Sequence, residues 1–291
     1  MNLKALVDAL DAHVAKMQGT PRSPASGPNE RRHLGASQIG KECSRALVYG
    51  FRAMTDVRFE GRILRLFARG HDEEPRVKEM LEFVGAKVTE IDPATGKQFR
   101  FVGYKGHFAG SSDGEVSNVP GLKQEFGVDP DIPILLEIKT HNLKWFNLLA
   151  STSNVKVSNP EHWWQMQTYM GARGLKGALY IGVCKDDDRW YCEYVPYEYT
   201  ATILVNKKAA EVIDATVLPL RIMHASPSFH KCMFCDHRAA CHFGAPAPKS
   251  CRSCKHSSAV QGQQWHCGKW DVIIPEERLL EGCPAWSQFH D

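Results

Sequence analysis

The most informative stretch of the chain is Ile134-Leu-Leu-Glu-Ile-Lys-Thr140, which has the character of a buried strand but carries two charges. In a strand, residues two positions apart face the same side of the sheet, so Glu137 and Lys139 project together. Leu136 and Ile138 then point the other way, into the core. Burying a carboxylate and an ammonium costs free energy unless the two groups pair or serve a metal ion. Alone, this pattern is also consistent with a structural ion pair on a solvated face.

An acidic residue upstream completes a metal-binding pattern. Asp113 ends the stretch Gly106-His-Phe-Ala-Gly-Ser-Ser-Asp, and the glycine that follows it permits close backbone approach. We expect Asp113 and Glu137 to lie on neighbouring strands, with their carboxylates converging on a divalent ion. Hard oxygen ligands suit Mg²⁺ or Mn²⁺, which can hold a phosphate and activate water. Lys139 would orient the attacking water or neutralise charge that develops on the phosphorane.

The segments around this strand predict an α/β fold. Their patterns predict helices over 44–84, 142–150, 160–173 and 199–215, and strands over 87–91, 99–102, 107–116, 134–139, 178–184 and 190–195. This order of elements predicts a mixed central sheet flanked by helices. Before it, helical spacing of apolar residues predicts a helix over 2–17, and Gly, Pro and Ser predict a flexible linker over 18–30.

Composition predicts the class of protein and its division into parts. The 291 residues are 43% hydrophobic and 24% charged, which is typical of a globular protein with a full core. No run approaches the ~18 apolar residues that cross a bilayer, and no signal peptide is visible, so we expect a cytoplasmic protein of a bacterium or a phage-infected host cell. We divide the chain into a helix and linker (1–30), a core domain (31–223) and a Cys/His-rich metal module (224–291).

The ordered motifs resemble the PD-(D/E)XK nucleases. Asp113, Glu137 and Lys139 match the D…E-x-K signature of that superfamily, and further motifs are similar to its RecB-like and lambda-exonuclease-like branches. The resemblance runs over about residues 34–242 and implies a restriction-endonuclease-like core and an Mg²⁺- or Mn²⁺-dependent deoxyribonuclease.

Two of these further motifs imply additional site residues. Arg69-Gly-His-Asp-Glu-Glu-Pro-Arg76 resembles the helix that supplies an extra acid or histidine to the metal site, with His71 at the RecB-like position and Glu74 at the exonuclease-type one. Gln165-Met-Gln-Thr-Tyr169 resembles the Q-x-x-x-Y motif, whose glutamine borders the active site in that family. By this resemblance Gln165, His71 and Glu74 join the site, although Tyr169 has the character of a core residue.

Basic residues gather in the first third of the chain. Residues 31–69 contain nine Lys and Arg against three acids. Four arginines have helical spacing that puts them on one face, where they would either track DNA phosphates or form a solvated surface: Arg58, Arg62, Arg65 and Arg69. In the RecB-like resemblance the nuclease domain begins just before Arg45, which makes that residue a further candidate phosphate contact.

Ten cysteines without a secretion signal argue for metal or cluster binding rather than disulfides. Cys232, Cys235 and Cys241 form a C-x2-C-x5-C pattern that lacks a fourth ligand. Cys43 is the natural donor, with His230, His237 or His242 as alternatives. This set resembles the cluster-bearing RecB-like nucleases, including those of CRISPR adaptation and the AddB subunits, where one early and three late cysteines hold a 4Fe–4S cluster. We favour the cluster, although the same thiolates also suit zinc.

A second set of cysteines follows. Its pattern C-x2-C-x12-C-x15-C suits a structural zinc site, with His256 and His266 as alternative ligands. The four residues of this second tetrad are Cys251, Cys254, Cys267 and Cys283.

These motifs together predict a stand-alone DNA exonuclease, of phage or mobile-element type, acting at DNA ends in recombination, replication or repair. Its expected partners are DNA and a recombination or replication protein, with no membrane. Two alternatives stay open. One is a catalytically weak DNA-binding or assembly module, and the other is a structure-specific or RNA nuclease.

Overall fold

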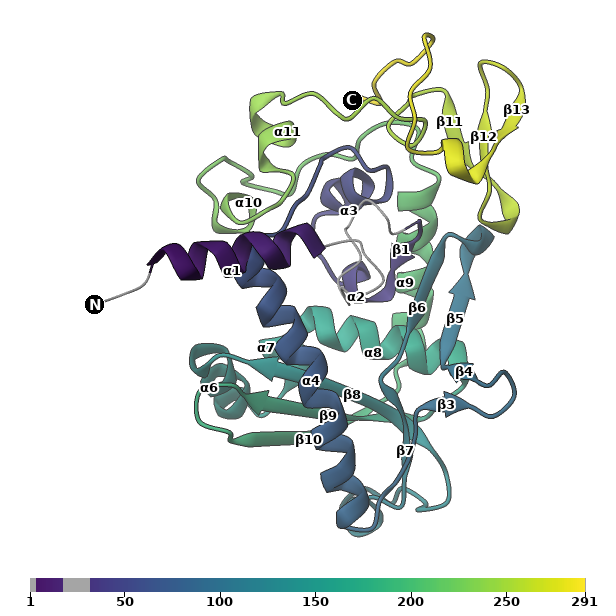
Figure 1. Ribbon diagram of the computed structural model, residues 1–291. Coiled ribbons are helices and arrows are strands. Elements are labelled where there is room, and N and C mark those ends of the chain that lie inside the picture. Colours follow the sequence, from purple (N-terminus) through teal and green to yellow (C-terminus); the bar gives the residue numbers. More distant parts are fainter. Residues whose placement is uncertain (1–3, 18–31, 291) are drawn as a thin grey trace. The chain divides into compact units, whose positions relative to one another are not determined.

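Strand β8 (Ile134–His141) lies inside a five-stranded sheet in the computed structural model, which describes residues 4–17 and 32–290 (Figure 1). The strand order is β10-β9-β8-β7-β2, with bounds Trp190–Pro196 (β10), Gly177–Cys184 (β9), Gly114–Ser117 (β7) and Lys87–Thr89 (β2). Strands β8 and β9 are parallel and the other neighbours are antiparallel. The predicted α/β fold with a mixed sheet is thus confirmed.

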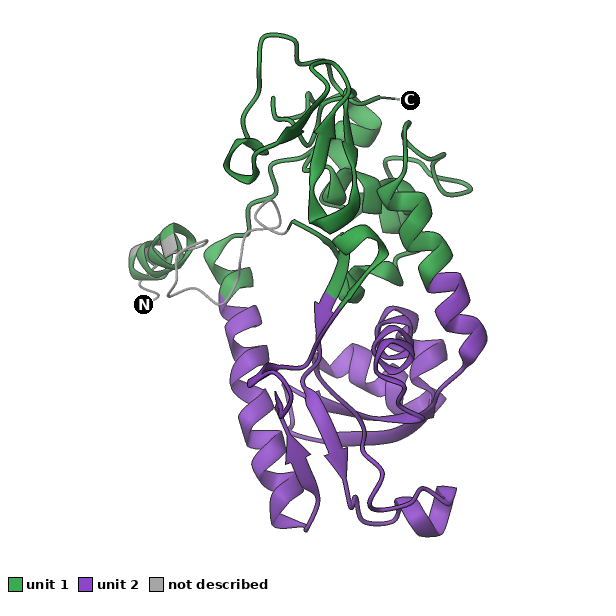
Figure 2. Ribbon diagram, turned by 90° about the vertical axis from the view of Figure 1, so that its right-hand side faces the viewer, with its two compact units in different colours: residues 1–64, 102–109, 206–291 green, residues 65–101, 110–205 purple. Residues whose placement is uncertain are grey.

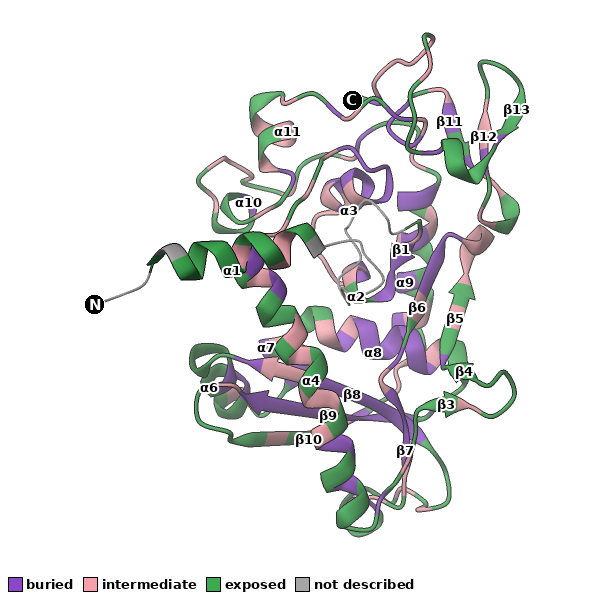
Figure 3. Ribbon diagram, viewed as in Figure 1, coloured by how far each residue is buried: buried purple, intermediate pink, exposed green. Residues whose placement is uncertain are grey.

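Helices cover both faces of this sheet, whose central strand β9 (Gly177–Cys184) is apolar on both sides. Helix α4 (Gly61–Phe83) packs Val77 and Leu81 against Leu136 and Ile138. Helices α6 (Leu143–Thr152) and α8 (Pro160–Arg173) also contact β8 and β9. Every residue of β9 is buried as a result (Figure 3).

The chain forms two compact units (Figure 2). Unit 2 consists of residues 65–101 and 110–205 and holds the five-stranded sheet, and unit 1 consists of residues 1–64, 102–109 and 206–291. Unit 2 also contains helices α5 (Leu122–Phe126) and α7 (Val155–Ser158) and the hairpin of β3 (Ile91–Asp92) and β4 (Lys97–Gln98). The composition-based division at residues 30 and 223 stays a prediction, and the expected linker over 18–30 lies outside the described residues.

Unit 1 is mainly helical and also contains short strands. Its helices are α1 (Lys4–Met17), α2 (Ala36–Ile39), α3 (Ser44–Phe51), α10 (His230–Met233) and α11 (Arg238–Phe243), and α9 (Tyr199–Ile213) enters it from residue 206. One sheet has the order β1-β6-β5, with bounds Leu34–Gly35, Phe108–Ser111 and Arg100–Gly103. The other has the order β11-β12-β13, with bounds Ser257–Ala259, Trp265–Cys267 and Val272–Ile274. Short 3-10 turns span Tyr104–Gly106, Gln261–Gln263 and Glu276–Arg278.

The strand expected over 107–116 is interrupted at Ser112 and Asp113, which separate β6 from β7. Gly114 has φ 147°, a conformation that side-chain-bearing residues rarely adopt. A Cβ atom there would also lie 2.9 Å from the carbonyl oxygen of Thr89. The glycine therefore permits the turn that takes Asp113 out of the regular ladder.

None of the helices within residues 4–17 and 32–290 combines the length and hydrophobicity needed to cross a membrane.

Candidate active site

Asp113 and Glu137 lie where β7 separates from β8, inside unit 2. The β7–β8 register runs only as far as Gly114 opposite Leu136. Immediately beyond it, the backbone N–H of Ile138 donates to the Asp113 carboxylate at 2.8 Å. Ile138 is flanked by Glu137 and Lys139, so one hydrogen bond fixes Asp113 beside both. The structure therefore brings together the three residues of the D…E-x-K pattern.

Glu137 is the most deeply buried charge of this group, with 0% exposure. Lys139 forms an ion pair with its Oε1, and among the described residues Oε2 has no hydrogen-bond partner. Burial, together with the charge of Asp113 and against the opposing effect of Lys139, raises the pKa of Glu137 to about 7. A buried carboxylate oxygen without a partner costs free energy unless it binds a ligand.

Helix α4 adds His71 and Glu74 to the same electrostatic environment. Nδ1 of His71 lies 3.4 Å from Oε1 of Glu74, one helical turn away. The hydrogen bond that His71 donates to Glu74 raises the pKa of His71, and the charge of Asp113 contributes. Burial pushes the pKa of Glu74 upward, but His71 and, more weakly, Lys139 bring it below its ordinary value. The two residues that the resemblance implied are thus in electrostatic contact with the D…E-x-K residues: His71 with Asp113, and Glu74 with Lys139.

The donor set fits a hard divalent ion. Its carboxylates come from Asp113, Glu137 and Glu74, and oxygen ligands are those that Mg²⁺ and Mn²⁺ prefer. The unpaired Oε2 of Glu137 is the observation that favours a ligand at this position. Among the described residues, no group of three or more His, Cys, Asp or Glu side chains is arranged to hold a metal ion. Side chains would therefore have to rotate for an ion to bind.

The Q-x-x-x-Y motif lies on α8, and its first and last residues make different contacts. Gln165 is buried, but no hydrogen bond within the described part of the chain joins it to the acidic residues. Tyr169 donates its hydroxyl hydrogen to the carbonyl oxygen of Ser111 at 2.6 Å. Ser111 ends β6 two residues before Asp113, so Tyr169 holds the start of the turn that carries the carboxylate.

Tyr169→Phe is therefore expected to slow cleavage by about 2- to 10-fold, the effect of losing one hydrogen bond, and to raise the metal concentration required. The measurement is the cleavage rate as a function of Mn²⁺ concentration. Tyr194→Phe is the matched control, because its hydroxyl also donates to a backbone carbonyl, that of Lys176, away from Asp113. An unchanged rate and metal requirement in Tyr169→Phe would reject the positioning role.

Two features near the site were not foreseen from the sequence. Lys78 lies one turn beyond Glu74 on α4, is buried, and pairs with Glu90 at 2.9 Å. Its charge acts on both Asp113 and Glu74. The spacing of Glu74 and Lys78, four residues apart on one helix, was the available signal.

The second unforeseen feature is a buried chain of His141, Tyr180 and His162. The Tyr180 hydroxyl lies 2.8 Å from Nε2 of His141 and 2.9 Å from Nδ1 of His162. Tyr180 is opposite Glu137 in the β8–β9 register, and His141 follows Glu137 by four strand residues. Burial lowers the pKa of both imidazoles, that of His141 to about 4, so both are neutral at pH 7. The alternation Glu137, Lys139, His141 was the signal that placed His141 on this face.

The arginines predicted to contact DNA differ in exposure. Arg62, Arg65 and Arg69 are exposed on α4. Arg58 is exposed too, but α4 begins only at Gly61, so the helical face predicted for four arginines does not include it; it pairs with Asp56 instead. Arg45 is 6% exposed and donates to the carbonyl oxygen of Pro219 at 2.9 Å. A phosphate contact by Arg45 would require its guanidinium to leave this position, and all five contacts stay predictions.

The cysteines of both tetrads lie in unit 1. Cys43 precedes α3, Cys232 is on α10 and Cys241 is on α11. Burial raises the pKa of the Cys232 thiol, and the charges of Cys241 and Cys43 add to the effect. His237 is less suited as an alternative ligand, because its Nδ1 is 2.7 Å from the Thr55 hydroxyl and its ring stacks on Tyr49. The second tetrad lines a single cavity, described below.

No protein-family model and no curated protein sequence matches the chain. Among solved structures, the alkaline exonuclease LHK-Exo from Laribacter hongkongensis is similar at a TM-score of 0.42 and 20% identity, over 62% of this chain and 86% of that chain. LHK-Exo in complex with dAMP is similar at 0.40 and 18%, over 64% and 88%. The protein SSO0001 is similar at 0.37 and 15%, over 72% and 86%.

Proposed function

We propose that the chain is a metal-dependent deoxyribonuclease that hydrolyses phosphodiester bonds at DNA ends, in recombination, replication or repair. One observation carries most of the weight: the fully buried carboxylate of Glu137, whose Oε2 has no hydrogen-bond partner among the described residues, lies beside Asp113 and Lys139 at the point where two strands separate. A structural ion pair has no need of a carboxylate oxygen without a hydrogen-bond partner.

In this proposal Asp113 and Glu137 hold an Mg²⁺ or Mn²⁺ ion, with Glu74 or His71 as a further ligand. When bound, such an ion polarises the scissile phosphate and makes a bound water more acidic. Asp113 is oriented for this by the Ile138 N–H and, through Ser111, by Tyr169. These contacts fix the carboxylate before substrate arrives, which reduces the reorganisation that the reaction requires.

Lys139 supplies positive charge on the substrate side of the site. Burial alone would lower its pKa, but Glu137 and Asp113 raise it above its ordinary value, so the ammonium stays protonated. Its ammonium can donate hydrogen bonds to a phosphate oxygen or to the attacking water. A protonated lysine there offsets the negative charge that develops on the phosphorane.

The test is digestion of end-labelled linear DNA and covalently closed circular DNA of the same sequence, each with Mg²⁺ or Mn²⁺ and with chelator as control. An exonuclease degrades the linear DNA and leaves the circle intact. Cleavage of circles would show an endonuclease, and cleavage of RNA alone would favour the RNA nuclease alternative. Tight DNA binding with no metal-dependent cleavage would support the assembly module and overturn the proposal.

A further inference from the structure

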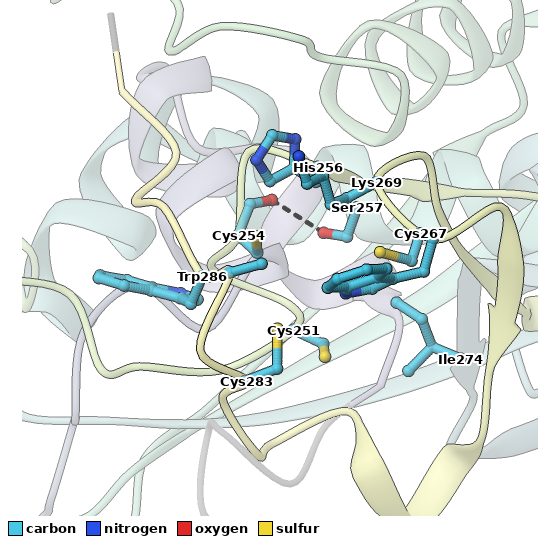
Figure 4. Close-up of a pocket in the computed structure, with 11 residues that line it drawn as sticks. Cys251, Cys254, His256, Ser257, Cys267, Lys269, Ile274, Cys283 and Trp286 are labelled. Carbon is cyan, nitrogen blue, oxygen red and sulfur yellow. Dashed lines mark hydrogen bonds between the residues drawn. The ribbon is translucent and has the colours of Figure 1, made fainter.

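Four cysteine thiols line one cavity in the C-terminal part of unit 1 (Figure 4). Cys251 and Cys254 flank a tight turn in which the N–H of Cys254 donates to the Cys251 carbonyl at 3.2 Å. Cys267 ends β12 opposite Ser257, and Cys283 precedes a turn closed by the N–H of Trp286. The cavity volume is about 20 Å³, which is room for a single water or ion.

The histidine alternatives are less suited to this cavity than the fourth thiol. Nε2 of His266 lies 3.0 Å from Oδ1 of Asp271, and His266 is not among the residues that line the cavity. His256 does line the cavity, but four thiols already satisfy the tetrahedral shell of a structural zinc ion. The donor chemistry of the cavity lining favours a shell of four thiolates over one of three thiolates and an imidazole.

The strongest evidence that the cysteine cavity carries negative charge comes from Arg52, at the end of α3. Its guanidinium is 3% exposed and donates to the carbonyl oxygens of Cys254 at 3.2 Å and Ser257 at 2.9 Å, and also to the Arg252 carbonyl. All of these acceptors are neutral. Within the part of the chain that the structure describes, no carboxylate forms an ion pair with Arg52. A buried cation without an anion is costly, so this environment calls for negative charge close by.

The same contacts link Arg52 to the cysteine turn, because one of its acceptors is the carbonyl oxygen of Cys254. The guanidinium also lies over the Phe289 ring, 3.8 Å from its centroid, which keeps water out. Neutral thiols supply no anion, whereas thiols that bind a metal ion are deprotonated.

We propose that Cys251, Cys254, Cys267 and Cys283 hold one zinc-class ion as a tetrathiolate, and that the buried Arg52 guanidinium offsets its excess negative charge. Ion binding releases the thiol protons to solvent and transfers no electrons. Arg52 thereby acts as a positioning residue, because its hydrogen bonds fix the turn that presents the first two thiolates. The ion in turn links this turn to the end of α3 within unit 1. The proposal is independent of nuclease activity.

The first test uses the unmodified full-length protein. We expect zinc on elemental analysis, and we expect all four thiols of the second tetrad to resist alkylation until a chelator is added, as read by peptide mass spectrometry. Peptide resolution separates these cysteines from Cys43 and its group. Replacement by Co²⁺ should give the intense visible bands of a tetrahedral thiolate site. Four thiols that react equally with and without chelator would overturn the metal site.

The second test concerns Arg52. We expect Arg52→Met to weaken zinc binding by about 10- to 100-fold, the usual effect of losing a group that supports metal ligands, in a competition titration with a chelator. Arg52→Lys, which keeps the charge, should lose less. Arg189→Met, which removes an exposed arginine paired with Asp187, is the control and should leave zinc affinity unchanged.

A double-mutant cycle separates charge balance from packing. If Arg52 acts through the tetrathiolate, Arg52→Met lowers the melting temperature far more in the wild-type background than in Cys267→Ser, where the anion is lost. Equal losses in both backgrounds would show that Arg52 has only a packing role and would overturn the charge-balance proposal. Should Arg52→Met fail to fold, the Arg52→Lys titration decides the same question.

Discussion

Glu137→Gln is expected to abolish metal-dependent cleavage of linear DNA while the protein stays folded and binds DNA. Glutamine has the shape of the fully buried side chain but lacks the charge that holds a divalent ion. A catalytic metal contributes several kcal/mol to transition-state stabilisation and each ~1.4 kcal/mol is tenfold in rate, so we expect a loss of about 1000-fold or more. Asp113→Asn should behave in the same way, because an amide oxygen can still accept the Ile138 N–H.

The direction of the stability change in Glu137→Gln shows whether the loss of cleavage comes from a missing metal ligand or from unfolding. Burial raises the pKa of Glu137 from its ordinary 4.5 to about 7, so ionisation favours the unfolded chain as pH rises between these values. Glu137→Gln lacks this penalty, and its melting temperature at pH 8 should not fall below that of the wild type. Calorimetry and single-turnover cleavage of labelled DNA at the same pH measure the two effects.

Glu115→Gln is the matched control for this pair of variants. Glu115 lies on β7, two residues after Asp113, and is also buried. It forms an ion pair with Arg173 at 3.0 Å and is not one of the proposed metal ligands. It should keep its cleavage rate within about threefold of wild type, as a substitution away from the reacting groups does. If Glu137→Gln cleaved DNA at a rate similar to that of Glu115→Gln, the assignment of the metal site would be wrong.

Local patterns were enough to predict the elements that carry the site. The apolar run at Ile134–Leu136 predicts a central strand, and the structure forms β8 there. The helix predicted over 160–173 has those bounds, because Asn159 and Pro160 begin it and Gly174 ends it in a left-handed conformation. Convergence of Asp113 and Glu137 followed from strand pairing, which alternation and chain order make predictable.

Features that depend on partners distant in sequence were not predictable from such patterns. The interruption between β6 and β7 at Asp113 is stabilised by the hydrogen bond that its carboxylate accepts from the Ile138 N–H. The buried Arg45 donates a hydrogen bond to the Pro219 carbonyl, 174 residues away in the chain. The Tyr180 hydroxyl joins two histidines that are 21 residues apart in the chain. In each case the local sequence is compatible with several environments, and the tertiary contact decides which one forms.

Cys43→Ser is expected to remove the metal of the first tetrad and to lower stability. Cys43 is the N-cap residue of α3, and its carbonyl oxygen accepts the N–H of Leu47. Serine is a better N-cap than cysteine, so the substitution should strengthen the start of the helix if the thiol has no other role. Any loss of stability would therefore report a role of the Cys43 thiol as a metal ligand.

The expected loss is at least about 3 kcal/mol, or roughly 6–12 °C in melting temperature for a chain of this size, because a structural metal contributes folding free energy directly. Cys192→Ser, at an exposed cysteine on β10 in unit 2, is the control and should leave both metal content and melting temperature unchanged.

The identity of the metal is a separate measurement. Iron and acid-labile sulfide in brown, anaerobically purified wild-type protein, absent from Cys43→Ser, would favour the 4Fe–4S cluster. Zinc in colourless protein would favour the same four ligands around a single ion. If Cys43→Ser kept the metal content and stability of the wild type, Cys43 would not be a ligand, and one of the nearby histidines would have to complete the site.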